Sequence, residues 1–452
     1  MRFLALALLV LFMSSSFALA NNATAAKKWT ILVYIAGDNN LAEAGLDDIN
    51  EMEHVGTTED FNIVVQIDGS HEYSPEAANT RRYLVEKDDD PKVINSPIVG
   101  EETEADMGSQ ETLEDFVLWG FEEYPAERYA VILWNHGNGW YPDDGLHKFR
   151  GPGLDGPMDP LKAICSDEDS DSAISTSGVG DVIERIAGKL GRRIDFVGFD
   201  ACLMGMAEAY YELRNSAWVA CASSKTEPGD GWPYDKWLSI LAQSPDLCPE
   251  ELGTALVETY VESYDGGSQG SENVTQSCVR FTESAVANFE AALFLFSQEL
   301  NRALSLDPQA VHDAIEATQD FQVRSFFGSY FTTHKDLFDF AVKIKEAFPE
   351  DEDIVTGAEL MMEAIEGPEG FVVANGITEV TPYGSVENSH GVAIYLPNDG
   401  YEDTYGSLDF IETGWYDFLD ELNSGKVIEG PQKRALANSQ KDIFGNLYGI
   451  ND

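Results

Sequence analysis

Two short sequences each join a run of apolar residues to a side chain that could take part in nucleophilic catalysis. The segment 131–137 (VILWNHG) ends in His136 and Gly137, and the segment 196–202 (FVGFDAC) ends in Cys202. A cysteine thiol is a modest nucleophile until a neighbouring imidazole takes its proton. The same imidazole can return that proton to a leaving amine. His136 and Cys202 are therefore candidates for a catalytic dyad that cleaves acyl bonds.

Gly137 adds a second feature to this candidate site. A glycine lets the backbone approach a substrate carbonyl, and the N–H groups of Gly137 and Cys202 could together form an oxyanion hole. Taken singly, a histidine after a strand is commonly a hydrogen-bonded loop residue, and a cysteine is commonly part of the core. The position of both residues directly after an apolar run favours catalysis over these two explanations.

The elements that must position these residues alternate in type along the first half of the chain. Apolar runs of strand length are followed by amphipathic segments of helical period, which is typical of a mostly parallel sheet covered by helices on both faces. The strands are predicted at 29–36, 61–67, 81–86, 128–134, 194–199 and 218–222, and the helices at 41–55, 110–124, 179–190 and 204–213. Sites in such sheets lie at the carboxyl ends of the strands, where His136 and Cys202 are expected.

The second half of the chain is predicted to be largely helical. Helical segments are expected at 235–243, 249–264, 284–304, 308–319, 336–348 and 353–366, with strands at 273–281, 371–373 and 391–396. The segment 141–176 is rich in Gly, Pro, Asp and Ser and is expected to be a long loop. The predicted fold class is α/β with a largely helical C-terminal region that adds strands. We place the boundaries at 27–283 for the core, 284–425 for the helical region and 426–452 for a polar tail.

The first residues indicate export. Residues 1–20 combine Arg2, an apolar run and a small-residue cleavage site, which is the pattern of a secretory signal peptide. No later segment is apolar for long enough to span a membrane, so no membrane contact is expected once the signal is removed. The mature chain is predicted to begin near Asn21 and to be secreted or periplasmic. A monomer is the default expectation.

Composition narrows the range of partners. The chain has 452 residues, 43% of them hydrophobic, and a formal net charge of −52, so it is globular and strongly acidic. Such a charge would repel phosphates, which argues against nucleic-acid binding. It could favour basic substrates or divalent cations, or simply keep the protein soluble. The five cysteines include no C-x-x-C pair; they could be buried thiols or include one reactive, unpaired thiol.

Three segments carry a resemblance to a known family. The sequences WTILVYIAGDNNL (29–41), VILWNHGNGW (131–140) and FVGFDACLMGMAEAYYEL (196–213) closely resemble the clostripain (C11) family within the caspase-like clan of cysteine peptidases, and the similarity extends to 227–234 and 390–397. The resemblance implies a caspase-like α/β/α sandwich and a dyad at His136 and Cys202. It also implies a secreted endopeptidase that cleaves polypeptides after Arg or Lys through a thioester acyl-enzyme.

The resemblance further implies an acidic pocket and self-processing. Asp200, two residues before Cys202, matches the family position of the pocket carboxylate, and Asp230 is a second candidate. A carboxylate would bind guanidinium or ammonium through a charge-assisted hydrogen bond, although Asp200 could also be a loop or capping residue and Asp230 a turn residue. Self-cleavage is expected in the loop 141–176, at Lys148, Arg150 or Lys162, unless that loop stays intact.

Calcium dependence also occurs in the family, although the chemistry itself requires no cofactor. Asp167, Asp169 and Asp171 offer alternating oxygen ligands, but the segment is not an EF-hand because Ser172 and Gly178 stand where that loop needs Gly and Glu. A solvated acidic loop is the alternative. The competing function is a catalytically silent caspase-like module that binds calcium or a protein partner.

Overall fold

The structure is a computed structural model in which residues 26–71, 73–74, 78–140, 164–321, 323–324, 330–331, 333–381, 384–398 and 403–424 are described. Several predicted features lie outside the described residues. These are the signal peptide (1–20), the tail (426–452) and the self-cleavage candidates Lys148, Arg150 and Lys162.

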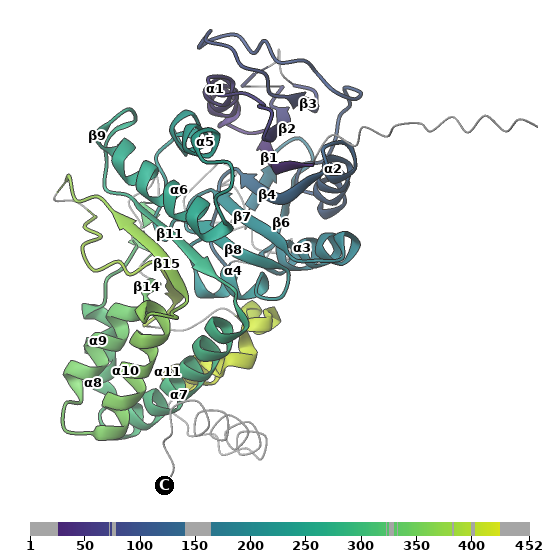
Figure 1. The fold of residues 1–452 in the computed structure, drawn as a ribbon. Coiled ribbons are helices and arrows are strands. Elements are labelled where there is room, and N and C mark those ends of the chain that lie inside the picture. Colours follow the sequence, from purple (N-terminus) through teal and green to yellow (C-terminus); the bar gives the residue numbers. More distant parts are fainter. Residues whose placement is uncertain are drawn as a thin grey trace, which may run out of the picture.

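An eight-stranded sheet forms the centre of the molecule (Figure 1). Its strands, in spatial order, are β15 (Val372–Ile377), β11 (Thr275–Arg280), β8 (Ala217–Ala222), β7 (Ile194–Asp200), β4 (Ala126–Trp134), β1 (Lys27–Gly37), β2 (Phe61–Gly69) and β3 (Arg81–Leu84). The five strands from β8 to β2 are parallel to one another. At one end of this parallel group, β3 pairs antiparallel to β2. At the other end, β11 pairs antiparallel to β8, and β15 pairs antiparallel to β11. The prediction of a mostly parallel sheet is confirmed.

The strands are long apolar runs because both faces of the sheet are covered. Alternate side chains of β1 enter two different hydrophobic clusters: Ile31 and Val33 face one side, and Leu32 and Tyr34 the other. The first side is packed by α1 (Ala42–Glu53), α5 (Tyr234–Gln243) and α6 (Pro249–Tyr264). The second side is packed by α2 (Gln110–Glu123), α3 (Thr176–Leu190) and α4 (Ala207–Glu212). The layers form the expected α/β/α sandwich.

Five further helices gather at one end of the molecule, below the β15 side of the sheet in Figure 1. They are α7 (Glu283–Leu306), α8 (Pro308–Ala317), α9 (Leu337–Ala347), α10 (Glu352–Glu366) and α11 (Trp415–Ser424). Buried Phe296 of α7 and Phe418 of α11 belong to the same hydrophobic cluster as Leu133 of β4, so the core runs on into this region. The boundary between 283 and 284 stays a prediction.

The remaining short elements lie around these layers. β14 (His334–Asp336) pairs with β16 (Ala393–Tyr395) outside the main sheet, so the predicted strand at 391–396 exists but joins a sheet of its own. The others are β9 (Asp265–Gly267) with β10 (Gly270–Ser271), β12 (Val323–Arg324) with β13 (Tyr330–Phe331), and the 3₁₀ helices η2 (Asp403–Ser407) and η3 (Asp409–Thr413).

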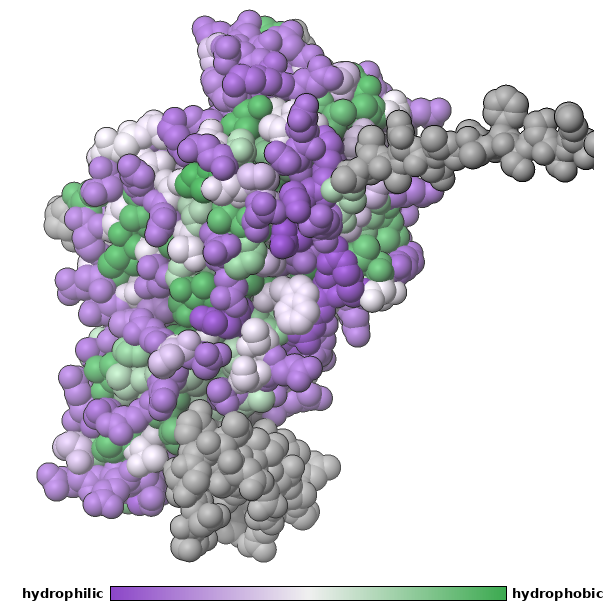
Figure 2. Space-filling view, viewed as in Figure 1, coloured by the Kyte–Doolittle hydropathy of each residue, from purple (hydrophilic) through white to green (hydrophobic). Residues whose placement is uncertain are grey.

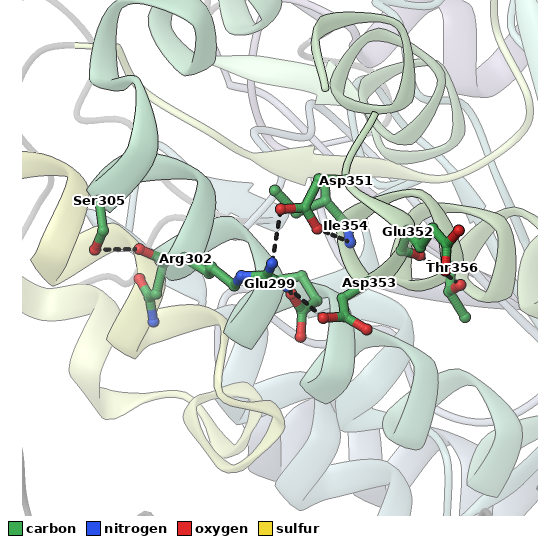
Figure 3. Close-up of polar contacts among 9 residues, drawn as sticks. Glu299, Arg302, Ser305, Asp351, Glu352, Asp353, Ile354 and Thr356 are labelled. Carbon is green, nitrogen blue, oxygen red and sulfur yellow. Dashed lines mark hydrogen bonds and ion pairs between the residues drawn. The ribbon is translucent and has the colours of Figure 1, made fainter. Parts of the chain in front are cut away.

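One arginine joins two helices of this end region (Figure 3). The Arg302 guanidinium of α7 lies 2.6 Å from a carboxylate oxygen of Asp353, 2.7 Å from one of Asp351 and 3.2 Å from one of Glu299. Asp351 and Asp353 stand at the start of α10. In so acidic a chain, one cation thus faces three carboxylates, and solvent screening keeps the contribution of such exposed ion pairs small.

The molecular surface agrees with the composition. Hydrophilic residues predominate on the face shown in Figure 2, and hydrophobic patches are scattered among them. Within the described part of the chain, no helix combines the length and the apolar character needed to cross a membrane.

The prediction of an irregular loop over 141–176 is wrong for its last third. β5 (Ile164–Asp167) and β6 (Ser172–Ile174) form a hairpin, and α3 begins at once after it. The Asp167 side chain accepts a hydrogen bond from the backbone N–H of Ser170 (2.7 Å) and so closes the turn. Ser175 caps α3 by accepting from the Gly178 N–H. The Asp and Ser residues that suggested a loop instead bind backbone groups at element ends.

Candidate active site

The sheet brings the two candidate catalytic residues to the same edge. β4 and β7 are parallel neighbours, and Trp134 at the end of β4 is in register with Asp200 at the end of β7. The Asn135 N–H donates to the Asp200 carbonyl at 3.2 Å, which fixes the two chains just beyond the pair. His136 and Cys202 each lie two residues past this register position. The parallel pairing therefore places them side by side at the carboxyl ends of the strands.

The imidazole of His136 is oriented by a residue from a third strand end. His136 is exposed, and its Nε2 lies 2.7 Å from Oδ1 of Asn40, in the turn that follows β1. An amide oxygen only accepts hydrogen bonds, so Nε2 carries the ring proton in this arrangement. Nδ1 is then the basic nitrogen that can exchange a proton with a thiol. With this contact, Asn40 is a candidate positioning residue that holds the ring and favours this tautomer.

Replacing Asn40 by alanine is expected to lower kcat roughly 10- to 100-fold with little change in KM, because general acid–base catalysis depends on the correct nitrogen and ring angle. Asn40→Asp keeps the acceptor oxygen and should retain more activity than Asn40→Ala. Because a carboxylate beside the ring raises the pKa of His136, it should also shift the pH profile of kcat. Steady-state kinetics on one fluorogenic substrate checks both variants. An unchanged kcat in Asn40→Ala would show that the contact is not used.

Cys202 follows β7 and is partly buried. Its Sγ accepts the backbone N–H of Glu227 at 3.3 Å. Burial raises the pKa of the Cys202 thiol above its ordinary value, and the N–H groups of Glu227, Cys202 and Gly137 offset this only in part. The resting thiol is therefore protonated at neutral pH and needs a base. The next helix, α4, begins only at Ala207 and has six residues, so a helix N-terminus does not stabilise the thiolate of Cys202.

Gly137 packs directly against the backbone of Cys202. A Cβ atom at this position would lie 2.2 Å from the Cys202 carbonyl oxygen and 3.1 Å from its nitrogen. Contacts this short are forbidden, so only glycine fits, and the two backbones meet beside the sulfur. Gly137 also forms an isolated bridge to Ile164, the first residue of β5.

Asp200 is buried beneath the nucleophile. Its Oδ2 accepts from the Tyr234 hydroxyl (2.9 Å) and the Trp232 N–H (3.4 Å). Gly231, whose φ is +53°, packs against the Asp200 carboxyl. A Cβ atom at position 231 would lie 3.0 Å from Asp200 Oδ1. Burial raises the pKa of Asp200 to about 6, against the hydrogen bonds from Glu227, Tyr234 and Trp232.

The Asp200 carboxyl shares its surroundings with two acids that the sequence analysis missed. Both carboxyl oxygens of Glu227 are buried, and burial and the negative charge of Asp200 raise the pKa of Glu227 well above its usual range. Asp48 of α1 accepts from Trp134 Nε1 at 2.6 Å, and burial and Asp200 raise its pKa as well. These three carboxyls cannot all ionise together, so the group keeps protons at neutral pH.

Asp230, the second acid predicted for the pocket, lies at the surface. Asp230 is exposed, and its carbonyl accepts from Gln269 Nε2 at 2.7 Å. It belongs to the same loop as Glu227 and Trp232, but its carboxylate is not part of the buried acidic group. The structure thus buries Asp200 near Cys202 and leaves Asp230 at the surface.

The three aspartates predicted to bind calcium do not converge on one point. Asp167 is buried and accepts the Met107 N–H at 2.8 Å, whereas Asp169 is exposed and pairs with His71 Nδ1 at 3.0 Å. Among the described residues, the group of three ligand-type side chains that does converge is His71, Glu104 and Asp169.

The hairpin β5–β6 is tied through Ser166 to the turns that carry His136 and Asn40. Its N–H donates to Asn135 Oδ1 at 3.0 Å, and its carbonyl accepts from Asn39 Nδ2 at 3.1 Å. Asn135 precedes His136 and Asn39 precedes Asn40. The contact gives the loop between the two catalytic residues a physical link to the orientation of the imidazole.

Two of these residues left only a weak signal in the sequence. Asn40 lies in the turn GDNN, where asparagine is an ordinary turn residue. Glu227 opens the segment EPGDGWPY, in which Asp230 attracted attention as the acid. Only the folded chain shows that Asn40 contacts His136 and that Glu227 contacts both Cys202 and Asp200.

Most of the chain is similar to one known family of proteins. A sequence model of the clostripain family, peptidase family C11, matches residues 33–423. Clostripain from Hathewaya histolytica is 30% identical over 235 residues, which cover 46% of this chain and 41% of clostripain. The match thus spans less than half of clostripain's own length.

Two solved structures share the fold. One is a secreted C11 cysteine protease from Bacteroides thetaiotaomicron in complex with an irreversible peptide inhibitor, with a TM-score of 0.61 and 20% identity over 87% of this chain and 99% of that one. The other is an inactive zymogen C11 protease from Parabacteroides distasonis, with a TM-score of 0.60 and 19% identity over 87% and 98%.

Proposed function

Because this chain belongs to the clostripain family of cysteine-type endopeptidases, we propose that it is a secreted enzyme that cleaves polypeptides after Arg or Lys with His136 and Cys202. The observation that carries the proposal is the register of β4 and β7, which brings an oriented imidazole, a thiol and a buried acid to one edge of the sheet. The family chemistry needs no cofactor.

The proposed reaction proceeds through a thioester. Nδ1 of His136 takes the Sγ proton, and the thiolate attacks the scissile carbonyl carbon. The N–H groups of Gly137 and Cys202 donate to the resulting oxyanion. When the C–N bond breaks, His136 protonates the leaving amine and an acyl-enzyme remains on Cys202. Water then attacks the thioester carbonyl with His136 as its base, which releases the acid and restores the thiol.

Specificity follows from the acids at the site. A guanidinium or ammonium group reaching Asp200 would form a charge-assisted hydrogen bond in a water-poor environment. Glu227 adds a second buried carboxyl beside it, and Asp230 at the surface attracts the same cations on entry. An acidic pocket of this kind disfavours Asp and Glu side chains by like-charge repulsion, and it leaves an apolar side chain beside unpaired polar groups.

Self-processing and export are part of the proposal. The candidate cleavage sites lie between His136 and Cys202 in the sequence, at Lys148, Arg150 and Lys162. The hairpin that follows them contacts the turns of His136 and Asn40 through Ser166. Cleavage in this segment could thus alter the site. One structural relative is secreted and another is an inactive zymogen, which supports the same pattern here.

A calcium ion would have candidate ligands near the turns that carry Asn40 and His136. Asp68 at the end of β2 is fully buried, and neither of its carboxyl oxygens has a protein donor in good geometry. Burial and the charge of Glu104 raise the pKa of Asp68 to about 8, and the nearby Thr80 hydroxyl opposes this only in part. Glu104 in turn converges with His71 and Asp169. Such an oxygen-rich group suits a hard cation, which would neutralise it and hold the hairpin.

The test is a panel of matched fluorogenic peptides that differ only in the residue before the cut: Arg, Lys, Asp or Leu. Each peptide is run under mild reduction, with calcium or with a chelator. We expect cleavage of the Arg and Lys peptides alone, and a faster rate with calcium. Equal cleavage of the Leu peptide would refute the acidic pocket. A folded, processed protein that cleaves none of them would indicate the catalytically silent module instead.

A further inference from the structure

Two of the five cysteines lie opposite each other on the second and third strands from one edge of the sheet. Cys221 of β8 and Cys278 of β11 are direct partners in an antiparallel pair. Both side chains are fully buried. The other three cysteines lie elsewhere: Cys165 in β5, Cys202 after β7, and Cys248 before α6. The structure has all five as thiols.

The pairing satisfies the geometry of a disulfide. Directly opposed residues of an antiparallel pair have Cα atoms about 4.5–5.5 Å apart, within the range of about 4.4–6.8 Å seen for disulfides. The two side chains leave the sheet on the same face, and the Cys278 thiol lies close enough to help raise the pKa of the buried Cys221 thiol. No backbone movement is needed to bring the sulfurs together.

α6 packs directly against the two sulfurs at Gly253. At Gly253 of α6, a Cβ atom would stand 2.3 Å from Cys278 Sγ and 3.0 Å from Cys221 Sγ. Because both sulfurs lie this close to one point, the distance between them cannot exceed the sum of the two values. Any larger residue at position 253 would force the helix away from the sheet, so the chain keeps a glycine where the thiols meet.

We propose that Cys221 and Cys278 form a disulfide when the protein folds in an oxidising compartment. The oxidant is a small-molecule disulfide such as oxidised glutathione. The thiolate of one cysteine attacks a glutathione sulfur, which forms a mixed disulfide and releases one glutathione thiol. The second cysteine then attacks the protein sulfur, which forms the Cys221–Cys278 bond and releases the second glutathione. One glutathione disulfide is reduced as two protein thiols are oxidised.

The bond would act on the part of the sheet that supports the active site. β8 ends one residue after Cys221 and leads into the segment that carries Glu227, whose N–H contacts Cys202. β11 also holds β15 at the edge of the sheet. A cross-link here constrains both strands in the unfolded chain and raises Tm. Because it is buried under α6, mild reduction that keeps Cys202 active should leave it intact. This inference rests on the export included in the proposed function and not on the peptidase activity.

Thiol counting tests the proposal on the full chain. The protein is refolded in a glutathione redox buffer, freed of small thiols, denatured and alkylated with iodoacetamide, and the added groups are counted by intact mass. We expect three alkylated thiols in the wild type and five after prior reduction. Peptide mapping of the unreduced protein should show one linked pair that contains Cys221 and Cys278.

Single variants make the result specific. Cys221→Ala and Cys278→Ala should each raise the count from three to four, because the partner left behind becomes a thiol. Cys248→Ala is the matched control and should lower the count from three to two. A wild type with five thiols, or one that retains bound glutathione on either cysteine, would overturn the proposal. So would four thiols in all three variants.

Discussion

Replacing Cys202 by alanine is expected to lower kcat/KM for an Arg or Lys peptide by at least about 10⁴-fold, because no other group at the site can form the thioester. The same change should abolish cleavage of the chain between His136 and Cys202, which would leave one full-length species on a denaturing gel. Steady-state kinetics and gel analysis of freshly purified protein check both effects. The side chain is small and partly exposed, so the fold should persist.

Two controls separate the thiol from the rest of the site. His136→Ala should approach the same loss, since it removes the base that the protonated thiol requires, and the double variant should be no worse than the single ones. Cys248→Ala removes a thiol that precedes α6, outside the site, and should keep its activity. Full activity in a folded Cys202→Ala protein would contradict the assignment of the nucleophile.

Replacing Asp200 by asparagine is expected to remove most of the preference for basic residues. The substrate cation would lose its charged partner in a buried site, which costs about 3–5 kcal/mol and corresponds to roughly 10²- to 10⁴-fold in kcat/KM. The Leu peptide should be little affected, so the ratio of Arg to Leu cleavage reports the effect. Asp230→Asn is the matched control: its carboxylate is exposed at the surface, and we expect less than about a tenfold change.

The protonation of Asp200 gives this prediction a second readout. Burial raises the pKa of Asp200 to about 6. An acid is neutral below its pKa, so binding of a cationic competitive inhibitor should weaken as the pH falls through about 6. The groups that face Asp200, namely Glu227, Tyr234 and Asp48, set this value together, and Glu227→Gln should shift it. In Asp200→Asn the inhibition constant should lose this pH dependence. If that variant keeps the wild-type profile and the wild-type Arg to Leu ratio, Asp200 does not bind the cation.

Some features of the protein follow from local sequence. The run from Trp29 to Gly37 is apolar throughout because it forms a central strand that is covered on both faces. The positions of His136 and Cys202 directly after two such runs were enough to predict that they meet, since parallel strands end at the same edge of a sheet. Charge and composition likewise indicated a globular, acidic protein.

Other features depend on contacts between distant parts of the chain, and no local pattern encodes them. Asn40 looks like a turn residue until β1 and β4 pair and bring it to His136, 96 positions away. Glu227 becomes part of the acidic group only when its loop folds back over Asp200. The segment 164–174 is held as a hairpin by contacts outside it: Asp167 accepts from the Met107 N–H, and the Ser166 N–H donates to the Asn135 side chain.

The cysteines and the acids show most clearly which features local sequence predicts and which depend on tertiary structure. The sequence by itself determined the central strands and the sheet edge at which His136 and Cys202 lie, because hydrophobic periodicity is a local property. Only the tertiary structure decided that Cys221 faces Cys278, which requires the register of β8 against β11. It alone decided that Asp200 is buried while Asp230 stays exposed. Register and burial arise from packing between elements, and that is where the tautomer of His136 and the protonation of the pocket are set.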